Sequence, residues 1–200
     1  DVVITSAVRT AVGSLGKSLK NITGDKLGSI VISEAIKKSK INSNDIDEII
    51  MGQVLTGGAG QNPARQAAVR SKIPIEKPAY IVNQVCGSGL RSIASGFQSI
   101  RSGDSKIVLA GGQENMSLAP HTIHLRDGKK LGDVALTDTM IKDGLWDAFN
   151  EYHMGTTAEN VATKFQVTRE DQDKFALRSQ EKALEAQKNK KFKDEIVNIK

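Results

Sequence analysis

The chain has 200 residues, of which 38% are hydrophobic, 4% aromatic and 26% charged, with a net charge of +5, which is typical of one or two globular domains with an aliphatic core. Its apolar runs fall short of the roughly 18 residues that span a membrane, and its basic residues alternate with acidic ones, so we expect neither a membrane nor a nucleic-acid partner. The chain contains one cysteine, which excludes an intrachain disulfide and fits a reducing, cytoplasmic location. Its three histidines are scattered, so a metal site is not expected either.

The first half of the chain alternates short apolar runs with segments of helical periodicity. Repeated β–α units with short connections predict a layered α/β domain, with helices on the faces of a parallel or mixed sheet. In the first helix Asp25 is placed to cap the N-terminus, and in the second Pro63 suits the first turn. We expect strands at residues 1–8, 46–55, 79–84 and 106–112, and helices at residues 25–39, 62–71 and 87–102.

The pattern changes near residue 115, where polar, glycine and proline residues replace the periodic runs. Two helices are expected further on, and each begins with the pattern of a capping box, Thr156 with Glu159 and Thr168 with Asp171. The second of these helices has a stripe of small and apolar side chains at helical spacing, which we expect to be buried. This stripe consists of Phe175, Ser179, Ala183 and Ala186.

The only cysteine, Cys86, lies in the stretch NQVCGSGL, between an apolar run and a helical segment. A structural cysteine behaves as a small hydrophobe and suits the inside of an apolar run, whereas Cys86 is followed by small residues. At a helix start, backbone N–H groups and the helix dipole favour a thiolate and can stabilise an oxyanion on a bound acyl group. From the residues alone, a nucleophile and a cysteine in a plain tight turn both stay open.

The other candidate sites carry weaker signals. The glycine-rich stretch at residues 57–65 fits neither the P-loop nor the dinucleotide fingerprint, so a turn is expected there. His121 and His124 flank a polar loop and suit the surface. His153 directly precedes a predicted helix start, where a packed histidine and a functional one are equally compatible with the sequence. Residues 111–117, GGQENMS, follow a strand, where α/β sheets commonly place functional loops.

Five blocks of the sequence are similar, in order, to blocks of the thiolase family. They read SAVRTAVGSLG, GQVLTGGAGQNPARQAA, VNQVCGSGLRSIASGFQSI, GGQENMSLAPH and YHMGTTAENVA. The third block resembles the family's signature around the cysteine that carries the acyl group. The form HMGTTAEN resembles the biosynthetic type, which forms acetoacetyl-CoA, more than the degradative type that acts on long chains.

The resemblance implies a domain organisation. Residues 1–117 would form the first of two thiolase-like αβα core domains, with a mixed sheet, and residues 118–200 an incomplete loop domain, while the second core domain is absent from this chain. Thiolases also use a histidine in a Gly-His-Pro block, a second cysteine and a water-binding asparagine, and none of these blocks occurs here. We therefore expect the N-terminal part of a thiolase, inactive by itself.

The resemblance also implies the chemistry. Cys86 would be acetylated by acetyl-CoA, with its backbone N–H in the oxyanion hole, and Leu145, His153 and Met154 would line the pocket for the pantetheine and thioester. Condensation with a second acetyl-CoA would give acetoacetyl-CoA, and the reverse reaction is thiolysis. CoA thioesters are substrates, and no metal or other cofactor is expected. The polar segment at residues 120–142 resembles the loop through which the biosynthetic type forms homotetramers.

Two alternatives to this activity stay open. A decarboxylating condensing enzyme of the same superfamily, such as a ketoacyl synthase, also has a cysteine at a helix start, although the blocks QNPARQ and HMGTTAEN favour a thiolase. A non-catalytic chain that binds CoA or a partner chain would need neither the histidine nor the second cysteine that this sequence lacks.

Overall fold

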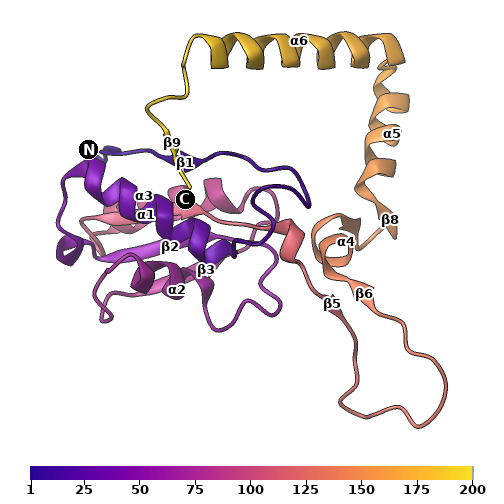
Figure 1. The fold of residues 1–200 in the computed structure, drawn as a ribbon, viewed down its shortest axis with the longest axis horizontal. Coiled ribbons are helices and arrows are strands. Elements are labelled where there is room, and N and C mark those ends of the chain that lie inside the picture. The colour runs from indigo at the N-terminus through magenta and orange to yellow at the C-terminus, as the bar shows by residue number, and fades with distance from the viewer. Residues whose placement is uncertain (200) are drawn as a thin grey trace. The chain divides into compact units, whose positions relative to one another are not determined.

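The computed structural model describes residues 1–199 and contains two compact units (Figure 1). The first unit comprises residues 1–144 and 197–199, and the second comprises Leu145–Ile196. The predicted α/β class is confirmed. The predicted division between residues 117 and 118 stays a prediction, and the first of these compact units continues to Gly144.

A three-stranded parallel sheet forms the centre of the first unit. β2 (Glu48–Gly52) lies between β3 (Ala79–Val82) and β4 (Val108–Gly112) and runs parallel to both. The last residues of the three strands are register partners, so the strands end at one edge of the sheet. The segments that follow the strands therefore begin side by side at that edge, where α/β sheets place their ligands.

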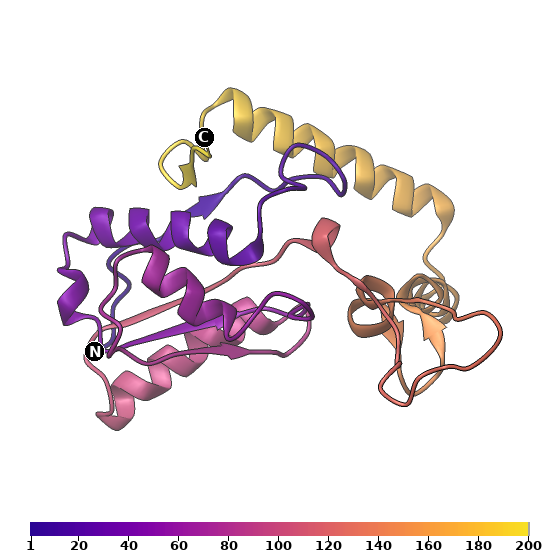
Figure 2. The ribbon, with the colours of Figure 1, turned by 60° about the horizontal axis from the view of Figure 1, so that its bottom comes forward.

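Helices cover both faces of this sheet (Figure 2). α1 (Gly24–Ser39) and α2 (Pro63–Arg70) pack on the face that carries Met51, and together they form the aliphatic core. α3 (Ser88–Ser102) packs on the opposite face, where Glu48 accepts a hydrogen bond from a serine of the helix. Glu48 and Met51 are three residues apart in a strand, so their side chains point to opposite faces.

The remaining elements of the first unit are short. The strands β5 (His121–Thr122) and β6 (Thr137–Asp138) pair antiparallel, and β1 pairs with β9. The other bounds are β1 (Arg9–Thr10), the 3-10 helices η1 (Ser43–Asp45) and η2 (Met116–Leu118), α4 (Thr139–Gly144) and β9 (Ile196–Val197), of which only Val197 belongs to this unit.

The second unit consists of a short hairpin and two helices. The hairpin pairs β7 (Trp146–Asp147) with β8 (Tyr152–His153), and α5 (Met154–Phe165) begins directly after it. α6 (Arg169–Lys188) follows after a short connection. None of the helices found in residues 1–199 is both long and apolar enough to cross a membrane.

Of the two capping boxes predicted for the helices of the second unit, one occurs in the structure. The box of Thr168 with Asp171 is confirmed at α6, where each side chain bonds the backbone of the other residue. The box of Thr156 with Glu159 is wrong, because α5 begins earlier and has His153 as its N-cap residue. Thr156 consequently lies inside the helix.

A predicted strand and a predicted buried stripe do not occur in the part of the chain that the structure describes. Residues 1–8 form no strand, and Val3 and Ile4 are largely exposed. The stripe on α6 is not buried either, since Phe175 is 76% exposed. A strand needs a neighbouring strand and a helical stripe needs an opposing surface, and neither is found within the unit concerned.

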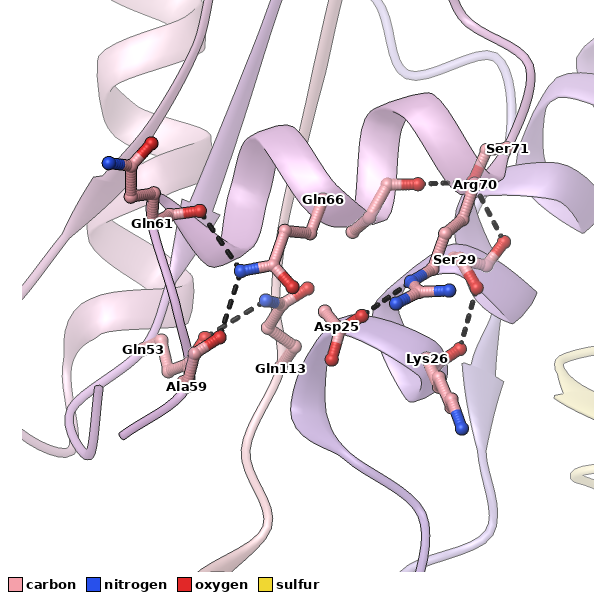
Figure 3. Close-up of polar contacts among 11 residues, drawn as sticks. Asp25, Lys26, Ser29, Gln53, Ala59, Gln61, Gln66, Arg70, Ser71 and Gln113 are labelled. Carbon is pink, nitrogen blue, oxygen red and sulfur yellow. Dashed lines mark hydrogen bonds and ion pairs between the residues drawn. The ribbon is translucent and has the colours of Figure 1, made fainter. Parts of the chain in front are cut away.

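An ion pair joins α1 to α2 (Figure 3). The predicted capping of α1 by Asp25 is wrong: Thr23 is the N-cap residue, and Asp25 lies in the first turn, where it accepts a hydrogen bond from Arg70 Nε at 2.6 Å. Asp25 is 7% exposed. Burial alone would raise the pKa of Asp25, but hydrogen bonds from Thr23 and Arg70, with the Arg70 charge, outweigh it and hold the pKa below its ordinary value.

Replacing Arg70 by methionine tests this pair. R70M keeps an apolar stem but leaves the buried Asp25 carboxylate without its cation, so we expect the free energy of unfolding at pH 7 to fall by about 1–3 kcal/mol, toward the lower figure because Arg70 is half-exposed. Since the pKa of Asp25 is depressed in the folded state, this contribution is present above about pH 3.8 and is lost as the pH falls further. Urea unfolding at neutral and acidic pH measures both effects.

R169M is the matched control, because Arg169 forms a 2.9 Å ion pair with Asp173 on the exposed side of α6. An exposed pair contributes less than about 1 kcal/mol, so this variant should unfold nearly as the parent does. Equal losses in R70M and R169M would contradict a distinct contribution of the buried carboxylate.

Candidate active site

Cys86 lies in a tight turn between β3 and α3, at the sheet edge where the strands end. It directly precedes Gly87, the N-cap residue of α3, so the structure places the cysteine at a helix start, as predicted. Its side chain is exposed and its thiol is free. An exposed sulfur at the positive end of a 15-residue helix can meet a substrate and can carry a developing negative charge.

The turn that holds Cys86 has a strained backbone. Val85 has φ at 48°, in the left-handed region, which is a genuine outlier for a β-branched residue. Such conformations persist only where surrounding contacts enforce them, and they gather at functional sites. Here Asn83 Oδ1 accepts from Val85 N at 2.9 Å, and the buried Ser88 hydroxyl accepts from Gln84 N at 2.8 Å and donates to the Val85 carbonyl at 2.6 Å.

The first turn of α3 lies directly against the backbone of β2. A Cβ on Gly52 would lie 2.3 Å from the carbonyl carbon of Ser88 and 2.5 Å from the nitrogen of Gly89, distances that real side chains do not show. At the end of β4, a Cβ on Gly112 would lie 3.3 Å from the Cα of Gly89. Only glycine at the end of β2 allows this approach, and the approach fixes the start of α3 and the turn before it.

The segment after β4 contacts two other loops through its polar side chains. Glu114 Oε2 accepts hydrogen bonds from the backbone N–H groups of Val54 at 2.8 Å and Leu55 at 3.2 Å. Asn115 donates from its amide to backbone carbonyls in residues 19–22. The segment predicted to carry a functional loop therefore holds its neighbouring loops in place through its polar side chains.

A buried amide pair joins Gln113 of this segment to Gln53, the residue after β2 (Figure 3). Gln113 Nε2 donates to Gln53 Oε1 at 2.9 Å, and Gln53 Nε2 donates to the carbonyl of Leu55 at 3.1 Å. Both glutamines are buried, and α1 approaches them so closely that a Cβ on Gly28 would lie 1.9 Å from Gln113 Oε1. The ends of β2 and β4 are thus joined by side chains as well as by the sheet.

The carboxyl of Glu114 has an unusual environment. Burial raises the pKa of Glu114 above its ordinary value, and the hydrogen bonds from Val54, Leu55 and Asn115 oppose the rise without cancelling it. Its second oxygen, Oε1, is buried and has no hydrogen-bond partner among residues 1–199. A proton on this carboxyl would therefore remove a buried charge that is only partly compensated.

The other predicted site residues, Leu145, His153 and Met154, lie together in the second unit. Met154 N donates to the Leu145 carbonyl at 2.8 Å, and His153 pairs with Trp146 across the hairpin. His153 Nδ1 accepts from Gly155 N at 2.9 Å as the N-cap of α5, so the neutral imidazole carries its proton on Nε2. Cys86 belongs to the first unit, so these three residues and the cysteine lie on different units.

Sequence reasoning missed the residues that shape the cysteine turn. Ser88 resembles a small spacer between two glycines, and nothing in the sequence indicates that Val85 is left-handed. Glu114 had a usable signal, because it is an acidic residue close behind a predicted strand, where side chains of neighbouring loops meet. In the part of the chain that the structure describes, no group of three or more His, Cys, Asp and Glu side chains could hold a metal ion.

Comparison with known sequences decides the family. Residues 2–200 match the family described as thiolase, N-terminal domain. The chain belongs to the thiolase family. It is similar to proteins named acetyl-CoA acetyltransferase: 54% identical over 197 residues to that of Paracoccus denitrificans and 56% over 196 residues to that of Rhizobium meliloti (strain 1021), each match covering 98% of this chain. A rat protein named cytosolic acetyl-CoA acetyltransferase is 52% identical over 198 residues, or 99% of the chain.

The matches cover 50% of each of these three proteins. This thiolase chain therefore spans about half the length of the curated relatives it matches. Within that half, the turn around Cys86 and the start of α5 both coincide with blocks in which the sequence resembles the family.

Gly52→Ala tests the contact between β2 and α3. The added methyl would displace the first turn of the helix, so we expect the free energy of unfolding to fall by about 1–3 kcal/mol and the alkylation rate of Cys86 to change. G111A in β4 is the matched control, because a Cβ there would meet Met51 Sδ at an ordinary 3.8 Å. A similar small effect of both substitutions on unfolding would contradict the close approach.

Glu114→Gln tests the buried carboxyl. A pKa that is higher in the folded than in the unfolded state gives a contribution to stability that is full below the ordinary pKa of 4.5 and is lost as the pH rises through the folded pKa. The free energy of unfolding of the parent should therefore decline with rising pH relative to E114Q, which cannot ionise. Urea unfolding over a pH series measures this difference, and a difference independent of pH would contradict the raised pKa.

Proposed function

We propose that this chain is the N-terminal half of an acetyl-CoA acetyltransferase, which joins two acetyl groups through an acetyl-cysteine intermediate. One observation carries the proposal: a free, exposed cysteine stands at a helix start, inside the block that resembles the thiolase nucleophile signature, in a chain 52–56% identical to relatives of that name. An exposed thiol held by a strained turn supports a nucleophile more than a packing role.

In the first half-reaction the Cys86 thiolate attacks the carbonyl carbon of acetyl-CoA. A carbon–sulfur bond forms to Cys86, the bond to the CoA sulfur breaks, and CoA leaves as a thiolate that takes up a proton. The backbone N–H of Cys86 and the positive end of the α3 dipole stabilise the oxyanion that forms on the way. No metal or other cofactor takes part, and CoA thioesters are the substrates.

In the second half-reaction a base removes a proton from the methyl group of a second acetyl-CoA. The resulting carbanion attacks the acetyl carbon on Cys86, a carbon–carbon bond forms, and the cysteine leaves as a thiolate. The product is acetoacetyl-CoA, and the reverse sequence is thiolysis. The only cysteine of this chain is already the nucleophile, so the second catalytic cysteine and the histidine of the family belong to a C-terminal half.

The second unit supplies substrate contacts in this proposal. Leu145, His153 and Met154 line the pocket for the pantetheine and thioester. Two observations support this assignment: the hairpin and the start of α5 bring the three residues together, and His153 and Met154 are exposed. Because His153 Nδ1 is engaged in capping α5, its Nε2–H is the group that donates to a substrate oxygen.

The proposal extends to assembly and location. The whole protein forms a homotetramer through residues 120–142, acts in the cytoplasm and serves lipid metabolism by supplying acetoacetyl-CoA. The exposed basic side chains of Arg126, Lys129 and Lys130 in that segment support a polar contact between copies. Solution mass measured by light scattering tests the assembly.

One observation favours a second candidate, a non-catalytic chain that binds CoA or a partner. The sequence contains a single cysteine and no Gly-His-Pro block, so this chain by itself lacks the groups for the second half-reaction. A decarboxylating condensing enzyme has less support, because the relatives named above are acetyl-CoA acetyltransferases.

Intact-mass spectrometry with acetyl-CoA separates these functions. We expect the natural polypeptide that carries this chain to gain about 42 Da, the mass of one acetyl group in place of the thiol hydrogen, and Cys86→Ser to remove both this adduct and the turnover to acetoacetyl-CoA. The 200-residue chain alone should produce no acetoacetyl-CoA. Wild-type turnover by the Cys86→Ser variant would overturn the nucleophile, and a polypeptide that binds CoA without any adduct would support the non-catalytic chain. Condensation that requires a malonyl thioester would indicate the decarboxylating enzyme.

A further inference from the structure

We propose that Ser88 is a positioning residue for Cys86: its hydroxyl holds Val85 in the left-handed conformation and thereby sets the direction of the Cys86 backbone N–H. The consequence for catalysis rests on the proposed function, whereas the effect on the cysteine turn does not. The geometry of five consecutive residues, 84–88, carries the inference.

The turn requires a restraint because Val85 is unfavourable in its conformation. At φ 48° the branched side chain crowds the backbone, and glycine or asparagine would be the usual residue. Val85 is 47% exposed, so a packed core does not hold it in this conformation. The restraint has to come from hydrogen bonds in the turn.

Ser88 supplies two of these hydrogen bonds from a single buried hydroxyl. It accepts from Gln84 N at 2.8 Å and donates to the Val85 carbonyl at 2.6 Å, so it bridges the peptide group that precedes Gln84 and the peptide group that follows Val85, on either side of the Gln84–Val85 segment. The Ser88 backbone N–H adds a 3.1 Å bond to the same carbonyl. The hydroxyl therefore points back into the turn and makes no N-cap bond of its own for α3, whose N-cap residue is Gly87.

The planar peptide transmits this restraint to the nucleophile. The carbonyl of Val85 and the N–H of Cys86 belong to one trans peptide and point in opposite directions. Holding the carbonyl toward Ser88 consequently aims the N–H of Cys86 to the opposite side of that peptide. In the proposed function this N–H is the oxyanion donor, and its aim decides how well it stabilises the developing charge.

Ser88 is itself fixed by the sheet. Its carbonyl group lies where a side chain on Gly52 would stand, so the residue cannot shift toward β2. Ser88 is only 4% exposed, so bulk water does not compete for the hydrogen bonds of its hydroxyl. The end of β2 thus restrains Ser88, Ser88 holds the Val85 carbonyl, and the direction of this carbonyl sets the direction of the Cys86 N–H.

Alkylation of Cys86 by iodoacetamide, measured in the natural polypeptide, tests the inference. We expect S88A to lower the second-order rate constant about threefold or more, because the turn relaxes and the thiol loses its fixed, exposed position before the helix start. S92A is the matched control: Ser92 is another buried serine of α3, with bonds of 2.7 and 2.6 Å to the carbonyls of Gly89 and Gly111, and its loss should leave the rate within about twofold. Equal rates in S88A and the parent would overturn the proposal.

The double variant S88A/V85G tests the route through Val85. Glycine adopts the left-handed conformation without strain, so removing the Ser88 hydroxyl should change the alkylation rate less in the V85G background than in the parent. V85G should also raise the melting temperature of S88A, or restore folding if S88A fails to fold. An effect of S88A that is the same in both backgrounds, or no rescue by V85G, would show that Ser88 does not act through Val85.

Steady-state kinetics separate this inference from the proposed function. If the natural polypeptide is an acetyl-CoA acetyltransferase, S88A should lower kcat about 10-fold or more with little change in KM, because the oxyanion donor is misdirected while substrate binding is retained. A KM effect alone would contradict the positioning role. If Cys86→Ser keeps its turnover, the proposed function fails, and the alkylation rates still decide the role of Ser88.

Discussion

The close contact between the end of β2 and the first turn of α3 is the constraint on which the site depends. At this contact two backbones meet with no room for a side chain, since a Cβ on Gly52 would lie 2.3 Å from the Ser88 carbonyl carbon. The contact determines where α3 begins, and the helix start determines where the preceding turn can run. The backbone of the central strand at Gly52 therefore determines where the exposed thiol of Cys86 lies, although Gly52 and Cys86 are far apart in the sequence.

The sequence predicted elements whose causes are local. The β–α alternation, the cysteine at a helix start and the box of Thr168 with Asp171 depend on neighbouring residues, and all of them occur in the structure. The strand at residues 1–8 and the buried stripe on α6 need partners that a local pattern cannot supply, and they do not occur. Local patterns also compete, since His153 caps α5 where Thr156 was the stronger sequence signal.

The position of Cys86 at a helix start was predictable from the sequence, and the residues that hold it there were not. Cys86 stands out because it is the only cysteine and is followed by small residues. Ser88, Val85 and Gly52 act through one hydroxyl, one backbone angle and one close approach, none of which has a sequence pattern. His153 illustrates the same limit in the second unit, because its capping bond to Gly155 fixes which nitrogen carries the proton, and only the structure reveals that bond.

The segment after β4 limits where residues can be inserted into or deleted from this chain. Gln113, Glu114 and Asn115 are consecutive, and each side chain reaches a different part of the chain: Gln53, the backbone at residues 54–55, and the carbonyls in residues 19–22. Inserting or deleting one residue here would move all three side chains away from their partners at once. Although it lies outside helices and strands, this connection is fixed in length, unlike most loops, in which insertions are tolerated.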